Sequence, residues 1–411
     1  MSLLPRFVEV GRQRPVDLVV PGSTLAEVAA PYAAVTGPGP LELTSGPDRL
    51  VARYDGDAVW LEVTARGRTT RHRSRRFARP GGPVDEVGLA LTGTHLTALT
   101  RAESRWTARA RADLRDVIDT RDQAWLAGLA SDAPTAGRFG QLGLRDVRLV
   151  SGLPEGRVVL SATSAGPGFF DTAHTSLWEL EPRSLTLTHL SDLFFRRSDR
   201  PGVYGDHATH VLRDGDEWLV ATSTWGDFHS KHKVVGVTLA RTTADLLSGV
   251  HVLDTEPLAL PVDGLRSVGV WDPHLARTDD GWLVGFVSAT KFFRFHPALA
   301  GGPSLDSLSL LGAARHLREA EGTTLAHLDG DWRVLASDKP GRRYPTYDLA
   351  MRETGEIAAP YPTNIPWPTL VRDGDEWLMV TFNGAPYGGR VCGYGTHGEL
   401  IFLRPEPGAT V

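Results

Sequence analysis

The stretch WDPHLARTDDGWLVG, residues 271–285, holds two apolar segments separated by an Asp-Asp-Gly turn, which is the pattern of a β-hairpin. A carboxylate, Asp272, stands at the head of the first predicted strand, where a buried apolar residue would be expected. The same hairpin recurs along the second part of the chain. The four strong copies are THVLRDGDEWLVATS (209–223), PHLARTDDGWLVGFVS (273–288), TTLAHLDGDWRVLAS (323–337) and PTLVRDGDEWLMVTF (368–382).

A tryptophan follows the turn in each strong copy: Trp218, Trp282, Trp332 and Trp377. Their spacings of 64, 50 and 45 residues leave room for about four strands in each unit. A weaker fifth copy, RDVRLVSGLPEGRVVLSATS, covers residues 145–164. A constant hairpin with variable spacing is typical of propeller blades whose outer loops differ in length. We therefore predict an all-β chain with a five-bladed β-propeller over residues 141–411, rather than a solenoid or two sandwiches.

The first part of the chain has a different pattern. Residues 1–112 contain short alternating segments that are rich in Thr and Val and are interrupted by Gly, Asp and Pro, which predicts an N-terminal β-sandwich. The segment DTRDQAWLAGLAS (119–131) has helical spacing of its apolar residues, and SDAPTAGRFG (131–140) has linker composition. We therefore predict a helical linker at 113–140 between an accessory sandwich and the propeller.

Composition excludes several classes of function. With 41% hydrophobic residues, 44 Gly and 28 Pro among 411 residues, the chain is typical of a turn-rich globular protein. A net charge of −5 argues against binding to nucleic acid or to an anionic membrane, and no apolar run reaches the roughly 20 residues that span a bilayer. One cysteine, Cys392, excludes an intrachain disulfide and a cysteine metal cluster. The first residues do not have a signal-peptide pattern, so we expect a cytoplasmic location.

Acidic residues stand at the heads of four repeats: Asp146, Asp206, Asp272 and Glu321. In a propeller, the first strand of each blade lines the axis, so these heads converge on one mouth of the channel. Carboxylates that lie close together raise one another's pKa, which costs stability. Glycoside hydrolysis uses such an arrangement, because it needs one protonated carboxyl group and one ionised carboxylate.

The turn glycines predict which of these acids lie at the same height. Gly281 lies nine residues after Asp272, and Gly330 lies nine residues after Glu321. Gly215 is likewise nine residues after Asp206, whereas Asp146 is ten residues before Gly156.

The repeats resemble those of family 43 glycoside hydrolases, five-bladed propellers that include β-xylosidases, α-L-arabinofuranosidases and arabinanases. The matching motifs are RDV at Asp146, WDPH at Asp272 and EGTT at Glu321. The resemblance implies that Asp146 is the general base, that Asp272 tunes and orients the acid, and that Glu321 is the general acid. It also implies an inverting mechanism, with base and acid carboxyl groups about 6.5–9.5 Å apart, on a pentose or furanoside linkage (an arabinofuranoside or a xyloside).

The chain departs from the family pattern at several positions. Val147 and Thr323 replace prolines, and Asp206-His207 replaces an aromatic-Ala-Pro motif, which leaves Asp206 as an alternative base. Trp367 stands where the family frequently has an axial histidine, which argues against a structural calcium ion on the axis. The reaction that the resemblance implies needs no organic cofactor.

Polar and aromatic residues near the strand heads are candidates for substrate binding. They are Asp206, His207, Trp225, Phe228, His274, Phe292, Arg343 and Trp367. His207 and His210 lie three residues apart and face opposite sides of a strand, which argues against a metal site. The expected partner is an oligosaccharide or glycoside substrate, with no nucleic acid and no membrane.

Three alternatives stay open at this point. A retaining furanosidase of the invertase group would have a Glu-Cys pair, but Gly322 follows Glu321. A phosphorylase on the same scaffold would need basic groups beside the acids, which the segment 339–343 contains. If neither Asp146 nor Asp206 faces the axis, a carbohydrate-binding propeller without catalysis becomes the better interpretation.

Overall fold

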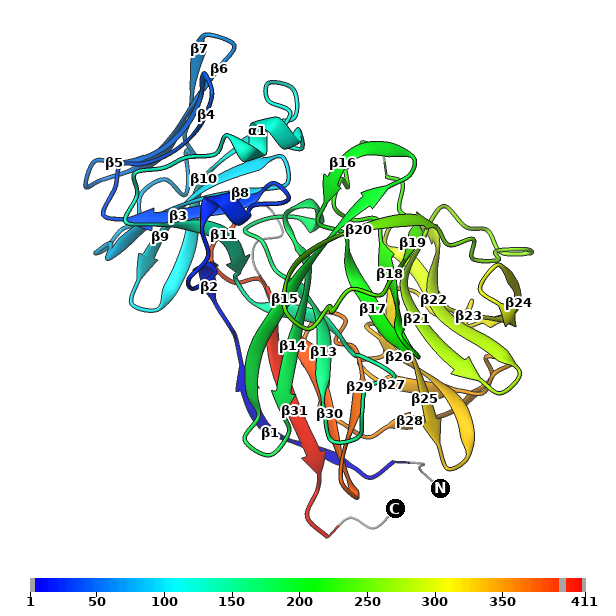
Figure 1. The fold of residues 1–411 in the computed structure, drawn as a ribbon. Helices are drawn as coiled ribbons and strands as arrows, with labels where there is room; N and C mark the ends of the chain where they lie inside the picture. The colour runs from blue at the N-terminus through cyan, green and yellow to red at the C-terminus, as the bar shows by residue number, and fades with distance from the viewer. Residues whose placement is uncertain (1–3, 232, 392–396, 409–411) are drawn as a thin grey trace.

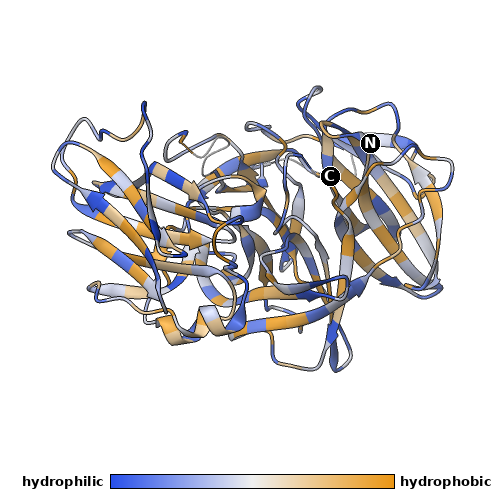
Figure 2. Ribbon diagram, turned by 90° about the horizontal axis from the view of Figure 1, so that it is seen from above, coloured by the Kyte–Doolittle hydropathy of each residue, from blue (hydrophilic) through white to orange (hydrophobic). Residues whose placement is uncertain are grey.

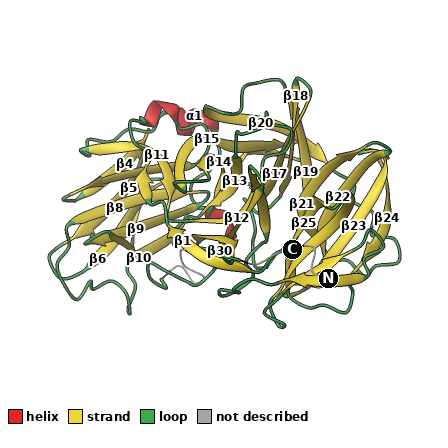
Figure 3. Cartoon of the chain, turned by 90° about the horizontal axis from the view of Figure 1, so that it is seen from below, coloured by secondary structure: helices red, strands yellow, loops and turns green. Residues whose placement is uncertain are grey.

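Strands dominate the structure (Figure 3), which is a computed structural model. It describes residues 4–231, 233–391 and 397–408, so Cys392 lies outside the described residues. In this part of the chain, no helix is long and apolar enough to cross a membrane. The strands form a β-sandwich beside a ring of five four-stranded antiparallel blades, of which the first two are joined through their outer strands into one sheet (Figure 1). The prediction of a five-bladed propeller with an N-terminal sandwich is therefore confirmed.

The first four blades follow one another along the chain. Blade one comprises β12 (Leu144–Leu149), β13 (Val159–Ser164), β14 (His174–Glu181) and β15 (Thr186–Arg197), and blade two comprises β17 (His207–Asp214), β18 (Glu217–Ser223), β19 (Val237–Thr242) and β20 (Gly249–Pro257). Blade three comprises β21 (Val270–Thr278), β22 (Gly281–Lys291), β23 (Arg294–Ser304) and β24 (Ser307–Ala313), and blade four comprises β25 (Ala320–Leu328), β26 (Asp331–Asp338), β27 (Tyr344–Tyr347) and β28 (Glu353–Ile357). The outer strands β15 and β20 also pair in parallel, and β16 (Arg200–Tyr204) pairs with β15.

Blade five takes its outer strand from the other end of the chain. It comprises β29 (Thr369–Asp373), β30 (Glu376–Asn383), β31 (Glu399–Pro405) and β1 (Phe7–Gln13). Strand β1 pairs antiparallel with β31, from Phe7 opposite Pro405 to Gln13 opposite Leu400 (Figure 1). The predicted sandwich boundaries of 1–112 are thus corrected, because β1 belongs to the propeller. The physical reason is that β1 completes the fourth strand of the blade and buries Phe7 at 1% exposure.

The sandwich has two sheets that share one apolar core. One sheet contains β4 (Leu41–Ser45), β5 (Asp48–Tyr54), β6 (Val59–Ala65) and β7 (Arg68–His72). The other contains β10 (Arg105–Asp113), β9 (His95–Ala102), β8 (Glu86–Thr92), β3 (Tyr32–Gly37), β11 (Thr135–Gln141) and β2 (Asp17–Val19). Buried and partly exposed residues alternate strictly along β6, so one face of that sheet packs inward. Figure 2 shows the same alternation of hydrophobic and hydrophilic residues along the strands.

The segment 113–140 is not a linker throughout. It contains one short helix, α1 (Gln123–Ala127), whose first turn is capped by the Asp122 carboxylate accepting from the Trp125 backbone N–H at 2.7 Å. Its last residues belong to β11, which inserts between β3 and β2 of the sandwich. Two single turns of 3-10 helix, η1 (Leu25–Glu27) and η2 (Phe170–Thr172), complete the elements.

The tryptophan that marks each strong repeat packs on a side chain of the neighbouring strand. In three blades, an arginine directly opposite stacks its guanidinium on the indole ring, with distances of 5.3 Å (Arg213–Trp218), 5.0 Å (Arg277–Trp282) and 3.5 Å (Arg372–Trp377). In blade four, His327 takes the place of the arginine beside Trp332. The repeated tryptophan therefore serves the packing of the hairpin, through cross-strand and cation–π contact.

Candidate active site

A bulge with the same backbone geometry interrupts the first strand of four blades. In blades one to four, the pairing of the first strand with the second shifts near its head, and one residue there adopts a left-handed conformation. These residues are Asp146 (φ 52°), Ala208 (φ 58°), Asp272 (φ 56°) and Gly322 (φ 69°). Because a bulge redirects side chains, it places Asp146 and Asp272 at equivalent positions and Glu321 one residue earlier in its strand.

Glycine is required beside Glu321 for two reasons. Gly322 has positive φ, and a Cβ atom there would lie 2.5 Å from the ring of Trp367. The Trp367 ring therefore packs directly on the backbone next to Glu321. The indole N–H groups of Trp271 and Trp367 lie near the Glu321 carboxyl and favour its ionised form, although neither makes a hydrogen bond of good geometry.

The heads of the first strands open into one cavity of about 200 Å³ on the axis. All five blades contribute to its lining, through Asp146, Ala208, Asp272, Glu321 and Trp367. The three carboxyl groups predicted to act together therefore lie around the same cavity. Their assigned roles remain predictions.

Burial is the main determinant of the protonation of Glu321. Burial, together with the negative charge of Asp146, raises the pKa of Glu321 to about 8. Lys339 and the two indole N–H groups act in the opposite direction. At neutral pH, Glu321 therefore holds a proton that it can donate, as a general acid must.

The other two carboxyl groups differ in their surroundings. Burial raises the pKa of Asp272 well above its usual range, and the charges of Glu321 and Asp146 raise it further. Burial also raises the pKa of Asp146, but Arg145 opposes this, with its Nε 3.2 Å from Asp146 Oδ2. Because of their mutual repulsion, the three carboxyl groups cannot all be ionised together at neutral pH.

A buried arginine that the sequence analysis missed crosses the axis below the carboxyl groups. Arg148 of blade one donates to the backbone oxygens of Asp272 (2.9 Å) and Thr323 (3.1 Å), and to Thr324 Oγ1 (3.2 Å). Its guanidinium also stacks on Trp367 at 4.5 Å. It is fully buried, and this burial lowers its pKa to about 10, so it remains charged at neutral pH. The signal in the sequence is an arginine in the middle of a first strand, two residues after Asp146.

The position of the Arg148 guanidinium decides whether a calcium ion would fit on the axis. The chain links blades one, three and four through Arg148, so a cation on the axis at this level would be repelled by the arginine. Among the described residues, no group of three or more His, Cys, Asp or Glu side chains is arranged to hold a metal ion. The residues present on the axis therefore do not fit a bound calcium.

The structure corrects the predicted place of Asp206. Its carboxylate accepts two hydrogen bonds from the buried Arg197 and one from the Gly226 backbone N–H at 2.9 Å, and it does not line the cavity. The register inferred from the turn glycines is wrong, because Gly281 is the first residue of β22 whereas Gly215 lies within its turn. The residue at the position of Asp272 in blade two is therefore Ala208.

Three other predicted binding residues also lie outside the cavity lining. Arg343 forms ion pairs with Asp338 and Glu353 at the outer part of blade four. His274 lies deeper along the axis, where its ring stacks on His210 at 4.0 Å, and burial lowers its pKa well below the usual range.

Phe228, the third of these residues, packs behind other aromatic side chains. Its ring contacts those of Phe170 and Phe292, at centroid distances of 5.4 and 5.3 Å. The remaining candidates do line the cavity: His207, Trp225, Phe292 and Trp367. Of the basic segment 339–343, Lys339 lines the cavity, where it is paired with Glu319.

The sandwich supports one side of this cavity. His95 of β9 contacts Asp171 of η2 through Nε2 and Oδ2 at 2.7 Å, and both side chains are buried. Tyr32 of β3 donates its hydroxyl to the Ala173 backbone oxygen at 2.7 Å. These contacts fix the segment that carries Phe170, which lines the cavity. The sandwich thus takes part in shaping the site.

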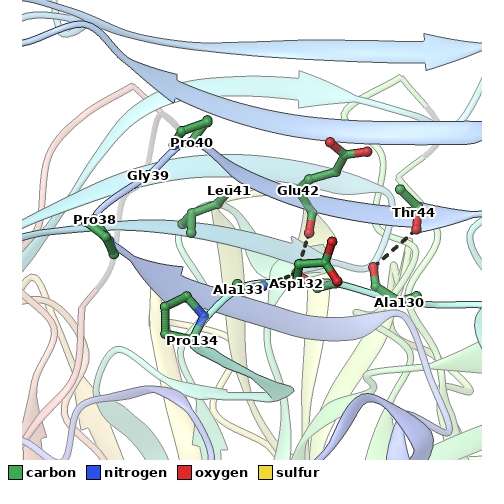
Figure 4. A pocket seen from close by; sticks show the side chains of 11 residues that line it. Pro38, Gly39, Pro40, Leu41, Glu42, Thr44, Ala130, Asp132, Ala133 and Pro134 are labelled. Atoms are coloured by element: carbon green, nitrogen blue, oxygen red, sulfur yellow. Dashed lines mark hydrogen bonds between the residues drawn. The ribbon is translucent and has the colours of Figure 1, made fainter.

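A second cavity, of about 390 Å³, lies in the sandwich between β4 and the segment 130–134 (Figure 4). Its polar groups are Glu42, Thr44, Ser131 and Asp132, and the two hydroxyl groups already donate to backbone oxygens. Its lining contains no aromatic ring and no basic side chain. The axial cavity is therefore the candidate site.

Comparison with known proteins gives similarity to solved structures alone. No family model matches the chain, and no curated protein matches it. A β-xylosidase, RS223, aligns with a TM-score of 0.45 and 11% identity over 65% of this chain and 94% of its own. A GH43_1 enzyme from Xanthomonas citri aligns with a TM-score of 0.45 and 13% identity over 65% of this chain and 89% of its own. A family 117 glycoside hydrolase from the marine bacterium Zobellia galactanivorans aligns with a TM-score of 0.46 and 10% identity over 64% of this chain and 84% of its own. At this level of similarity, the functional conclusion depends on the residues of the cavity.

Proposed function

We propose that this protein is a glycoside hydrolase that removes a terminal pentose or furanose residue with inversion at the anomeric carbon. The observation that carries the proposal is the meeting of Asp146, Asp272 and Glu321 in one axial cavity, with the pKa of Glu321 raised to about 8. This hydrolysis needs one carboxyl group that is protonated and a second that is ionised, and the two must therefore lie in different environments. The small cavity, with Arg148 crossing the axis below it, favours one terminal sugar over the middle of a long chain.

The reaction assigns one role to each group. Asp146 accepts a proton from a water molecule while the water oxygen bonds to the anomeric carbon. The bond between the anomeric carbon and the leaving oxygen breaks, and Glu321 gives its proton to that oxygen. Asp272 stays in place beside the two reacting groups and orients Glu321, while burial and the charges of Glu321 and Asp146 raise its own pKa. Solvent then returns a proton to Glu321 and removes one from Asp146.

The experiment compares wild type with Glu321→Gln on nitrophenyl α-L-arabinofuranosides and β-D-xylopyranosides. We expect the variant to lose hydrolysis of substrates with poor leaving groups and to retain more on dinitrophenyl substrates, which barely need protonation. Glu353→Gln is the matched control, because Glu353 pairs with Arg343 away from the cavity. Equal rates for Glu321→Gln and wild type would overturn the assignment.

The stereochemical claim has its own readout. Proton NMR of the first sugar released distinguishes inversion from retention, and Asp146→Asn should abolish turnover in either assay. A product with retained configuration would reject the inverting mechanism. Binding of oligosaccharides without any turnover by wild type would instead identify a non-catalytic carbohydrate-binding propeller.

A further inference from the structure

One side of the axial cavity is an uninterrupted wall of aromatic rings. We define the aromatic wall as Phe169, Phe170, Trp225, Phe292 and Phe293, which all line the cavity. Its rings contact one another, with centroid distances of 4.6 Å for Phe170–Trp225, 6.3 Å for Trp225–Phe292 and 6.4 Å for Phe292–Phe293. The wall brings together loops of blades one, two and three.

Two rings of the wall, Phe169 and Phe293, are exposed to solvent, which lowers their contribution to the stability of the folded state. Phe293 is 66% exposed, and its backbone has φ 65°, the left-handed region that a bulky residue rarely adopts. Phe169 is 40% exposed. An exposed, strained phenylalanine beside a cavity adds little to folding, so its place is better explained by a ligand that covers it.

The wall is continuous with the general acid. The Trp271 indole lies near Glu321, and its ring packs on Phe292 at 5.9 Å. Because Glu321 protonates the leaving oxygen, the leaving group extends from Glu321 toward the rings that pack on Trp271. Phe292 and Phe293, at the tip of the β22–β23 hairpin, line the same cavity on the side of Trp271.

The chemistry of the wall selects against a second sugar. The hydroxyl groups of a sugar lose hydrogen bonds to water on binding and need donors and acceptors in return. The wall has four phenylalanines, and its one polar side-chain atom is the Trp225 indole nitrogen. Apart from the three acids, the other polar side chains of the lining lie outside the wall: Arg145, His207, Asn364 and His397, and the Glu319–Lys339 pair of blade four. A flat apolar group gives up no hydrogen bonds when it moves from water to the wall, and it gains contacts with the rings.

We infer that the substrate is a small glycoside whose leaving group is an aromatic alcohol, held by Phe292 and Phe293, rather than an oligosaccharide. The inference rests on the proposed glycosidase function and adds the class of leaving group to it. It assigns specificity to the β22–β23 hairpin tip and leaves the identity of the sugar to the inner part of the cavity.

Binding of matched thioglycosides tests the inference without turnover. The probes are the methyl and 2-phenylethyl 1-thioglycosides of β-D-xylopyranose and of α-L-arabinofuranose, titrated by calorimetry. They differ by a benzyl group, that is by one methylene and the phenyl ring, and neither carries an activated leaving group. We expect wild type to bind the 2-phenylethyl probe about tenfold more tightly than the methyl probe, for one ring-stacking contact.

Two variants locate the effect. Phe293→Ala should reduce the ratio of the two affinities toward one, whereas Leu311→Ala, which removes an exposed apolar side chain of β24, should keep the wild-type ratio. Equal affinities of the two probes in wild type, or no binding of either at millimolar concentration, would overturn the inference.

The outcome is separable from that of the proposed function. Hydrolysis of nitrophenyl glycosides together with equal probe affinities would leave the glycosidase in place and reject the aromatic leaving group. A tenfold affinity ratio that depends on Phe293, in a protein without hydrolysis of any substrate, would support the aromatic site and reject the glycosidase.

Discussion

The free energy of unfolding should depend on pH through the titration of Glu321. The difference in stability between Glu321→Gln and wild type should therefore change with pH. The raised pKa means that the folded state holds the Glu321 proton more tightly than the unfolded chain does. Below the usual pKa of 4.5, both states are protonated and the carboxyl group makes no difference. As the pH rises from 4.5 to about 8, the unfolded chain loses the proton first, so the free energy of unfolding of wild type falls.

The size of this effect follows from the two pKa values. Each pKa unit corresponds to 1.36 kcal/mol, so a rise from 4.5 to about 8 gives an upper limit of about 5 kcal/mol. Coupling to Asp146 and Asp272 reduces this limit, because a proton bound by either neighbour removes a negative charge and lowers the pKa of Glu321. Glutamine has the same shape without the charge, so we expect Glu321→Gln to gain stability over wild type as the pH rises through this window.

Urea unfolding at several pH values between 5 and 9 measures the difference between variant and wild type. Glu42→Gln is the control, because Arg49 lowers the pKa of Glu42 and its titration lies below this range. A Glu321→Gln advantage that stays the same from pH 5 to pH 9 would refute the argument that burial and repulsion hold the proton on Glu321.

Three further outcomes are expected. In wild type, kcat/KM should fall as the pH rises through about 8, because the free enzyme then loses the Glu321 proton that the leaving group needs; a pH profile that is flat up to pH 10 would contradict this. Arg148→Met should lower the free energy of unfolding by about 2–5 kcal/mol, since two buried backbone oxygens lose their donor. In the same urea titration, Arg277→Met, which removes only an exposed cation–π contact, should lower it by about 0.5–1 kcal/mol. Asp171→Asn should raise KM several-fold with a smaller change in kcat, because the contact with His95 positions the cavity wall and not the reacting groups; steady-state kinetics with an unchanged KM would count against it.

The sequence predicted the parts of the fold that repeat. Each strong hairpin carries its own turn and its own tryptophan, so local pattern was sufficient to find four blades, and the weaker copy gave the fifth. Strand β1 escaped prediction because its partner, β31, lies at the other end of the chain. Nothing in residues 7–13 indicates a pairing at that distance, and a short alternating strand next to a sandwich is read as part of the sandwich.

The site shows the same division between local and distant information. Asp146, Asp272 and Glu321 were predicted because each stands at the head of a repeated strand, and all three line the axial cavity. Asp206 stands at such a head too, but the bulge and its pairing with Arg197 turn it away from the cavity. An ion pair of this kind depends on a side chain from another strand, so a repeat pattern cannot predict it. Arg148 was missed for the opposite reason, because a buried charge is unexpected in the middle of a strand.

Because β1 closes blade five, no single stretch of the chain after the sandwich contains the complete propeller. The sandwich lies in the sequence between β1 and β12, so it is an insertion within the ring and not an appended module. A fragment that starts after the sandwich would retain a last blade of three strands, with the edge of β31 free to pair with another molecule. A circular permutant that joins β31 to β1 through a short turn, and opens the chain elsewhere, would keep every blade whole. The shortest unit that can be expressed as a complete propeller is therefore a rearranged chain, not a truncated one.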